Sequence, residues 1–241
     1  MKKLILGFCL VLLISINSFA VELEKRNIED FHALRIFGNF RVELIYGDST
    51  YVTLQSYSIP LSKVTTEVEK GILKINMLSS FAKEDQISVR IFFKQLDEII
   101  LKGAANVERA PLIKSKFFNI ELAQGAKLKL NIESENLSLY ASSGALITVS
   151  GKTNYLSAEI SSGGMINALK MIANNVDATA TAGGYVKVKA IEKLDAKANA
   201  GGKIYYLGEV KMLNQKVTLN GEVIKLEEKI PLKNQTKDTL R

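Results

Sequence analysis

The stretch LSAEISSGGMINA, residues 156–168, contains the pattern that decides the fold. Leu156, Ala158 and Ile160 alternate with polar residues, which is typical of a strand with one buried and one solvated face. Gly163 then interrupts the strand, a second small residue follows it, and another short alternating segment completes the unit. A glycine held between two strands predicts a tight corner, where a Cβ would clash or where φ is positive.

The same pattern recurs along the chain. The other copies are FNIELAQGAKLKL from Phe118, LSLYASSGALITV from Leu137, VDATATAGGYVKV from Val176, LDAKANAGGKIYY from Leu194 and a looser one, LDEIILKGAANVE, from Leu96. Their corner glycines are Gly103, Gly125, Gly144, Gly163, Gly183 and Gly201. Units of strand, corner, strand and polar connection, repeated about every 20 residues, are typical of a solenoid.

The sequence therefore predicts an all-β fold, a parallel β-helix-like solenoid with coils of about 20 residues and regular repeats over 96–206. Consecutive coils are expected to hydrogen-bond in parallel, one coil per repeat. The many inward alanines predict a narrow, filled interior. A closed sandwich or barrel with a duplicated motif is the main alternative.

The segments outside the repeats are less regular. Residues 21–94 alternate as strands, and they either begin the same solenoid or cap its end. Lys216 to Leu226 predicts a C-terminal hairpin around Asn220-Gly221, which either caps the last coil or joins a second subunit in a homo-oligomer. We expect residues 21–230 to form one domain and residues 231–241 to form a frayed polar tail.

The N-terminus indicates export. Lys2 and Lys3 precede an apolar run from Leu4 to Ile16, and Ser18-Phe19-Ala20 fits a cleavage site, so residues 1–20 are predicted to be a signal peptide. The run is too short to span a membrane. Its removal would also remove Cys9, the only cysteine, which suits a disulfide-free protein of a bacterial envelope. The predicted location is the periplasm, the outer surface or the medium.

Composition excludes several classes of function. With 1 His and 1 Cys, histidine-rich metal sites and most catalytic triads are excluded, and no cofactor is expected. The net charge of +7 is spread along a chain of mixed Lys and Glu, which argues against nucleic-acid binding. No Trp and 7% aromatic residues argue against a broad aromatic stacking platform.

The candidate binding residues lie on the predicted outward face. The second position of each repeat is occupied by Asn119, Ser138, Ser157, Asp177 and Asp195. In register, Asp177 and Asp195 would lie about 5 Å apart, where two carboxylates could serve glycoside hydrolysis or bind a hard cation. Glu159 and Lys197 share this face, and the favoured interpretation is a solvated surface on which Lys197 offsets the acids.

A second outward column is small and polar. It contains Ser142, Ser143, Ser161, Ser162, Thr181 and Asn199. It could form a hydrogen-bonding ribbon for a glycan or a protein. The favoured interpretation is that these corner residues bond to their own backbone.

The repeats resemble the bacterial family described as "putative auto-transporter adhesin, head GIN domain". The resemblance rests on the opening FHALRIFGNFRVEL from Phe31, the serial glycine corners, Gly164-Met165-Ile166-Asn167 and the closing ANAGGKIYYLGEV from Ala198. It covers about residues 31–230 and implies an extracytoplasmic β-helix-like domain, often from Bacteroidetes-type bacteria, without catalytic residues to transfer.

These observations predict a non-catalytic module of the cell envelope, an adhesin or a surface or periplasmic binding protein. It would present flat β-ladders to a protein or glycan of the envelope or of a host surface. We expect recognition on a strand face rather than in a deep pocket. A β-helix enzyme that acts on polysaccharide through Asp177 and Asp195 is the alternative.

Overall fold

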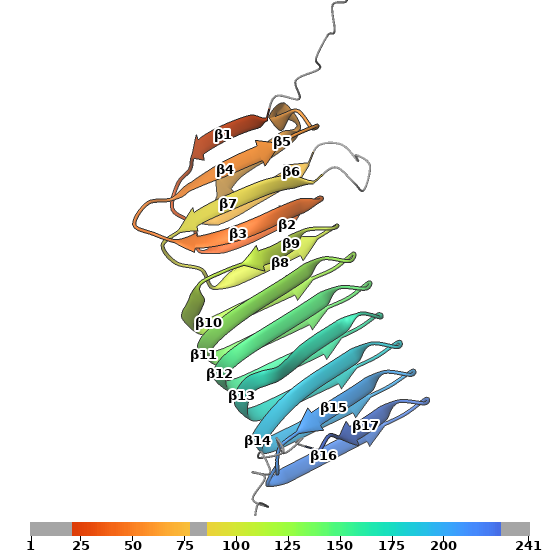
Figure 1. The fold of residues 1–241 in the computed structure, drawn as a ribbon. Coiled ribbons are helices and arrows are strands. Elements are labelled where there is room, and N and C mark those ends of the chain that lie inside the picture. Colours follow the sequence, from red (N-terminus) through yellow and green to blue (C-terminus); the bar gives the residue numbers. More distant parts are fainter. Residues whose placement is uncertain (1–20, 78–85, 228–241) are drawn as a thin grey trace, which may run out of the picture.

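The computed structural model describes residues 21–77 and 86–227, which form an elongated stack of β-coils (Figure 1). The predicted signal peptide and polar tail lie outside these residues. The strands are β1 (Glu22–Asn27), β2 (Ala33–Phe37), β3 (Phe40–Tyr46), β4 (Tyr51–Ser56), β5 (Val64–Glu69), β6 (Ile72–Met77), β7 (Ile87–Phe93), β8 (Glu98–Lys102), β9 (Asn106–Arg109), β10 (Leu112–Leu122), β11 (Lys127–Ala141), β12 (Leu146–Ile160), β13 (Met165–Ala180), β14 (Tyr185–Ala198), β15 (Lys203–Leu207), β16 (Met212–Val217) and β17 (Glu222–Lys225). A short 3-10 helix, η1 (Leu61–Lys63), lies between β4 and β5.

Each coil has two walls, joined by a tight corner at one edge and a gradual bend at the other. The first wall precedes the corner and the second wall follows it. The long strands β11 to β14 each run along the second wall of one coil, round the bend, and along the first wall of the next. All pairings among β10 to β14 are parallel, so the predicted solenoid with one coil per repeat is confirmed.

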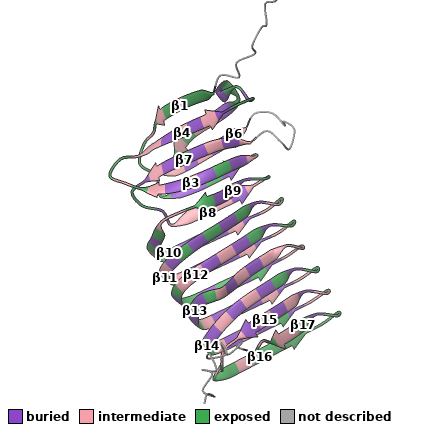
Figure 2. Ribbon diagram, viewed as in Figure 1, coloured by how far each residue is buried: buried purple, intermediate pink, exposed green. Residues whose placement is uncertain are grey.

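The core lies between the walls and stacks equivalent residues in register. Leu139 pairs with Ala158, Ala158 with Ala178, and Ala178 with Ala196, and all four side chains are buried. The buried hydrophobic side chains form one continuous cluster along the solenoid. Figure 2 shows buried residues alternating with more exposed ones along the strands. The two-residue period of the sequence thus separates the interior from the outer faces.

The corners are two-residue turns with left-handed backbone. At the first regular corner, Gln124 has φ of 57° and Gly125 has φ of 78°, and the N–H of Ala126 donates to the carbonyl of Ala123 at 3.2 Å. Two consecutive positive φ angles define a type I′ turn. The Gly125 N–H also donates to the carbonyl of Ser143 in the next coil, at 3.0 Å. The corners are therefore hydrogen-bonded to one another along the edge of the stack.

The N-terminal part both begins the solenoid and caps it. β2 pairs in parallel with β8, and β3 with β9, so these two strands form a coil continuous with the repeats. β6 and β7 pair in parallel with β2 and β3 and add a further coil, beyond which the sheet direction changes. β5 pairs antiparallel with β6 in the first wall, and β4 pairs antiparallel with β1 and β7 in the second wall. Both interpretations of residues 21–94 are thus correct for different parts of the segment.

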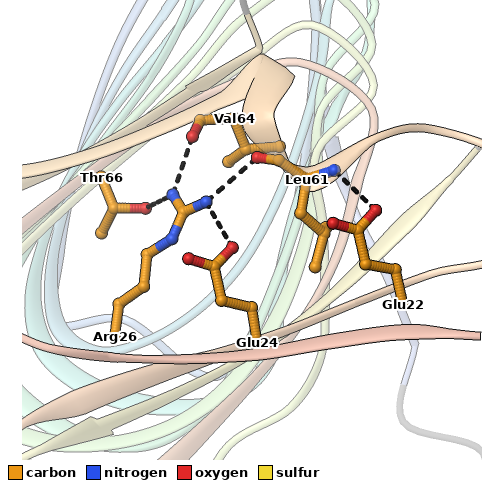
Figure 3. Close-up of polar contacts among 6 residues, drawn as sticks. All are labelled: Glu22, Glu24, Arg26, Leu61, Val64 and Thr66. Carbon is orange, nitrogen blue, oxygen red and sulfur yellow. Dashed lines mark hydrogen bonds and ion pairs between the residues drawn. The ribbon is translucent and has the colours of Figure 1, made fainter.

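Arg26 fastens the two walls together at this end (Figure 3). From β1 in the second wall, its guanidinium donates to the carbonyl of Val64 at 2.7 Å and to the hydroxyl of Thr66 at 2.8 Å, both in β5 of the first wall. It also donates to the Leu61 carbonyl at 3.0 Å and to the carboxylate of Glu24 at 2.8 Å. A planar guanidinium with five donors suits this kind of multiple contact.

The predicted C-terminal hairpin is wrong. β16 pairs in parallel with β14, and β17 pairs in parallel with β15, so Lys216 to Leu226 is the end of one more coil. Leu219 and Asn220 have positive φ and form another corner of the same type, closed by the Gly221 N–H on the Thr218 carbonyl at 3.0 Å. A type I′ turn serves hairpins as well as these corners, so the turn residues alone indicated the wrong pairing.

Candidate functional site

A column of polar residues runs along the outer surface of the first wall. Its members occupy equivalent positions on successive strands and are Glu98, Asn119, Ser138, Ser157, Asp177, Asp195 and Asn214. We call this set the polar column. The strand period fixes their direction, because their neighbours in sequence, such as Ile120, Leu137 and Leu194, are buried. The structure therefore aligns the five residues singled out in the sequence and adds one at each end.

Asp177 and Asp195 are neighbours in the polar column but differ in their surroundings. Asp195 forms an ion pair with Lys193 at 2.6 Å and accepts a hydrogen bond from the Asn214 amide at 2.6 Å. These two contacts hold the pKa of Asp195 below its ordinary value. Partial burial, and then the hydrogen-bonded carboxylate of Asp195, raise the pKa of Asp177. The cation that ion-pairs with Asp195 is Lys193, not Lys197.

Glu159 and Lys197 lie in the adjacent column and do not meet. Thr179 separates them, because Glu159 pairs with Thr179 and Thr179 pairs with Lys197. Lys197 lowers the pKa of Asp177 through its charge, but this effect is smaller than the opposing effects of burial and Asp195. The four candidate residues thus share one face without forming a single cluster. Over residues 21–77 and 86–227, no group of three or more His, Cys, Asp or Glu could hold a metal ion.

Three of the six small polar residues at the corners, Ser161, Thr181 and Asn199, form side-chain hydrogen bonds with nearby groups. The Thr181 hydroxyl lies 3.2 Å from the carbonyls of both Ile160 and Ser161. The Ser161 hydroxyl forms a hydrogen bond with the Tyr140 hydroxyl at 2.8 Å. The Thr218 hydroxyl donates to the Asn199 side chain at 2.9 Å. These contacts favour a local structural role for the corner column.

A groove of about 600 Å³ lies on the same outer surface, nearer the N-terminus. Its lining includes Phe117, Tyr155, Asn136 and three members of the polar column, Asn119, Ser138 and Ser157. The groove exists because β8 begins at Glu98, opposite Asn119, so no residue of β8 lies opposite Phe117. Phe117 is 60% exposed and Tyr155 is 43% exposed.

The sequence pattern did not predict this groove, because the repeat unit that starts at Phe118 leaves Phe117 outside the aligned segments. The signal was the Phe117-Phe118 pair itself, because a strand that buries one of two adjacent residues exposes the other.

The family model described as "Putative auto-transporter adhesin, head GIN domain" matches residues 30–209. The chain belongs to this family. The match spans the coils that carry the polar column from Glu98 to Asp195 and the groove beside it. Among curated proteins, none matches this chain significantly.

Several solved structures of similar fold come from Bacteroides and Parabacteroides species. A "putative adhesin" from Bacteroides fragilis is 17% identical, with 86% of this chain and 97% of that chain covered and a TM-score of 0.78. A "putative adhesin" from Parabacteroides distasonis is 18% identical, with 87% and 98% covered and a TM-score of 0.71. A "putative lipid binding protein" from the same species is 20% identical, with 86% and 97% covered and a TM-score of 0.62. At these identities the likeness concerns the fold.

In the part of the chain that the structure describes, no helix has the length and apolar character that crossing a membrane requires.

Proposed function

We propose that this protein is an exported, non-catalytic adhesin-like module of the cell envelope that binds an elongated partner on the outer face of its first wall. The observation that carries the proposal is the polar column, which continues in register across seven strands beside a groove. A long, regular surface of this kind matches a partner that is itself extended, such as a glycan or a protein of the envelope or of a host surface. The family description as an adhesin supports the same role.

The geometry of Asp177 and Asp195 argues against the enzymatic alternative. A glycosidase needs two carboxyl groups that flank the scissile bond and act on it. Asp177 and Asp195 instead pair directly in register on adjacent strands. Asp195 is also occupied by Lys193 and Asn214. The pKa values of the two acids do move in opposite directions, as in acid–base pairs, but burial of Asp177 and the Lys193 and Asn214 contacts of Asp195 are the main causes.

Export follows from the signal peptide predicted for residues 1–20. Sequencing the N-terminus of protein purified from the envelope fraction is expected to give Val21 as the first residue. Mature protein that begins at Met1 would contradict export through this signal.

The binding proposal is tested by the attachment of fluorescently labelled protein to bacterial envelope fractions and to host epithelial cells. We expect saturable binding to at least one of them. Ser138→Arg, which places a large cation in the polar column, should weaken binding, whereas Thr148→Arg on the second wall should not. Absence of binding, or equal loss in both variants, would refute the proposed site. Polysaccharide hydrolysis that is lost in Asp177→Asn would instead support the enzyme.

A further inference from the structure

The groove beside the polar column displays two exposed aromatic rings at a regular spacing. Phe117 pairs with Asn136 on the next strand, and Asn136 pairs with Tyr155 on the strand after that. Adjacent strands lie about 4.8 Å apart, so the two aromatic residues stand about 10 Å apart along the solenoid axis. A single exposed aromatic residue is ordinary on a protein surface, but two that line the same groove indicate a contact surface.

The floor between the rings offers unused hydrogen-bonding groups. Among the described residues, the side chains of Asn136, Ser138 and Ser157 have no hydrogen-bond partner. An amide and two hydroxyls together supply several donors and acceptors without charge. This part of the groove can therefore bind neutral polar groups.

The charged residues of the groove lie at its margins and have partners. Asp97 pairs with His32 at 3.1 Å, and Glu98 pairs with Arg35 at 3.3 Å. The ammonium of Lys116 lies 5.6 Å from the centre of the Phe117 ring and 3.9 Å from the carboxylate of Glu135. Because each of these charged groups already has a polar partner, the groove does not select for a charged ligand.

Rings and neutral polar groups in this arrangement suit sugar residues. A pyranose presents an apolar C–H face to an aromatic ring, while its hydroxyls exchange hydrogen bonds with amides and serines. The spacing of the two aromatic residues is close to one disaccharide of an extended β-linked chain. A peptide that binds by strand addition needs a free strand edge, and the floor strands β11 and β12 are paired on both edges. Among the strands of the groove that the structure describes, only the part of β10 up to Phe118 lacks a partner on its β8 side.

We propose that this groove binds an uncharged, extended β-linked glycan whose chain runs along the solenoid axis, with sugar rings on Phe117 and Tyr155. The inference rests on the proposed function and names the partner class at its surface. We infer this direction of the glycan from the strand register, because successive sugars of a chain that crosses the strands would meet equivalent positions of successive coils.

The test measures binding of two uncharged β-linked oligosaccharides, cellohexaose and chitohexaose, to the purified protein by calorimetry and saturation-transfer NMR. We expect at least one to bind, and Phe117→Ala and Tyr155→Ala each to weaken its affinity by about tenfold or more. Phe117→Tyr, which retains a ring, should restore binding. Tyr185→Ala is the matched control, because Tyr185 is 39% exposed but lies on the second wall.

Two results would overturn the glycan assignment. One is that neither oligosaccharide binds the wild-type protein. The other is that Phe117→Ala and Tyr155→Ala bind like wild type, or that Tyr185→Ala loses as much. The attachment of fluorescently labelled protein to envelope fractions and cells separates a failure of the glycan assignment from a failure of the proposed function. If the wild-type protein still attaches to them and both aromatic variants attach equally well, the binding module stands and the glycan groove does not.

Discussion

A Cβ on Gly202 would lie 2.2 Å from the carbonyl oxygen of Ala180 in the preceding coil. The corner glycines differ from it, since a Cβ on Gly183 would meet nothing within 4 Å while its φ is 71°. Two different physical constraints therefore act on the glycines at the corners. One is the left-handed backbone of the turn, and the other is the approach of consecutive coils just after it.

Substitution of the two glycines should separate these constraints. Gly183→Ala should lower the free energy of unfolding by about 1 kcal/mol, the cost of left-handed backbone for an L-residue. Gly202→Ala should cost more, because the backbone at Ala180 must move. Gly164 and Gly221 meet the same limit, since a Cβ there would lie 2.4 Å from the carbonyl oxygens of Ala145 and Ala198, whereas Ala126 and Ala145 show that other coils accept a Cβ at the equivalent place. Urea denaturation measures both, and a smaller loss for Gly202→Ala would contradict the steric argument.

The narrow interior makes a second prediction. Ala178 is buried between Ala158 and Ala196 in the inward column, so Ala178→Leu must force three extra carbons into a packed space. We expect a loss of about 1–3 kcal/mol in the free energy of unfolding. Thr179→Leu, one residue along and facing outward, should change stability by less than about 0.5 kcal/mol. Equal effects at the two positions would mean that the interior has free space.

Substitution of Asp177 and of Asp195 should change the stability of the protein in opposite directions at neutral pH. The folded pKa of Asp177 is raised, so its carboxylate disfavours the fold at neutral pH, and Asp177→Asn should stabilise the protein there by a few tenths of a kcal/mol. The gain should vanish below the ordinary pKa of 3.8, where the carboxyl is protonated in both states.

Asp195 should behave in the opposite way. Its folded pKa is lowered, so it contributes stability above its ordinary pKa and loses that contribution as the pH falls through the lowered value. Asp195→Asn should therefore destabilise the protein at pH 7 and have little effect in acid. Thermal unfolding followed from pH 7 to pH 3 measures both variants, and shifts of the same sign at pH 7 would refute the assignment.

Removal of residues 211–241 should make the protein aggregate. β16 and β17 pair with β14 and β15, so the truncation leaves the outer edges of those two strands unpaired. Light scattering compares the truncated protein with the full chain. A full chain that is oligomeric and a truncated form that is a stable monomer would show instead that the last coil is a subunit interface.

The repeats specified most of the fold before any coordinates. Leu137, Leu156 and Leu194 open their units at the same place, and the structure pairs equivalent positions strand by strand. This succeeded because a strand register that buries one face is set by a two-residue period, which is visible in the sequence. The same period placed Asp177 beside Asp195.

The sequence pattern did not reveal whether neighbouring strands pair in parallel or antiparallel, nor where the surface is hollowed into a groove. Alternation in Tyr51 to Ser56 indicates a strand but not that it runs antiparallel to its neighbours. Asn220-Gly221 indicates a turn but not which strands flank it, although the 19-residue step from Leu194 to its partner Leu213 continued the repeat. The groove at Phe117 depends on where β8 starts, which is a property of the packed coil rather than of any single segment.

The register described for the first wall also ties the length of the binding surface to the number of coils. Each coil contacts essentially its neighbours alone, so a gain or loss of one whole repeat would change the length of the stack by one strand spacing and leave the other coils intact. Every added coil would contribute one more row to the polar column. The span of partner that the surface can cover is therefore quantised, and it can be lengthened or shortened through duplication or deletion of a stretch of chain without redesign of the fold.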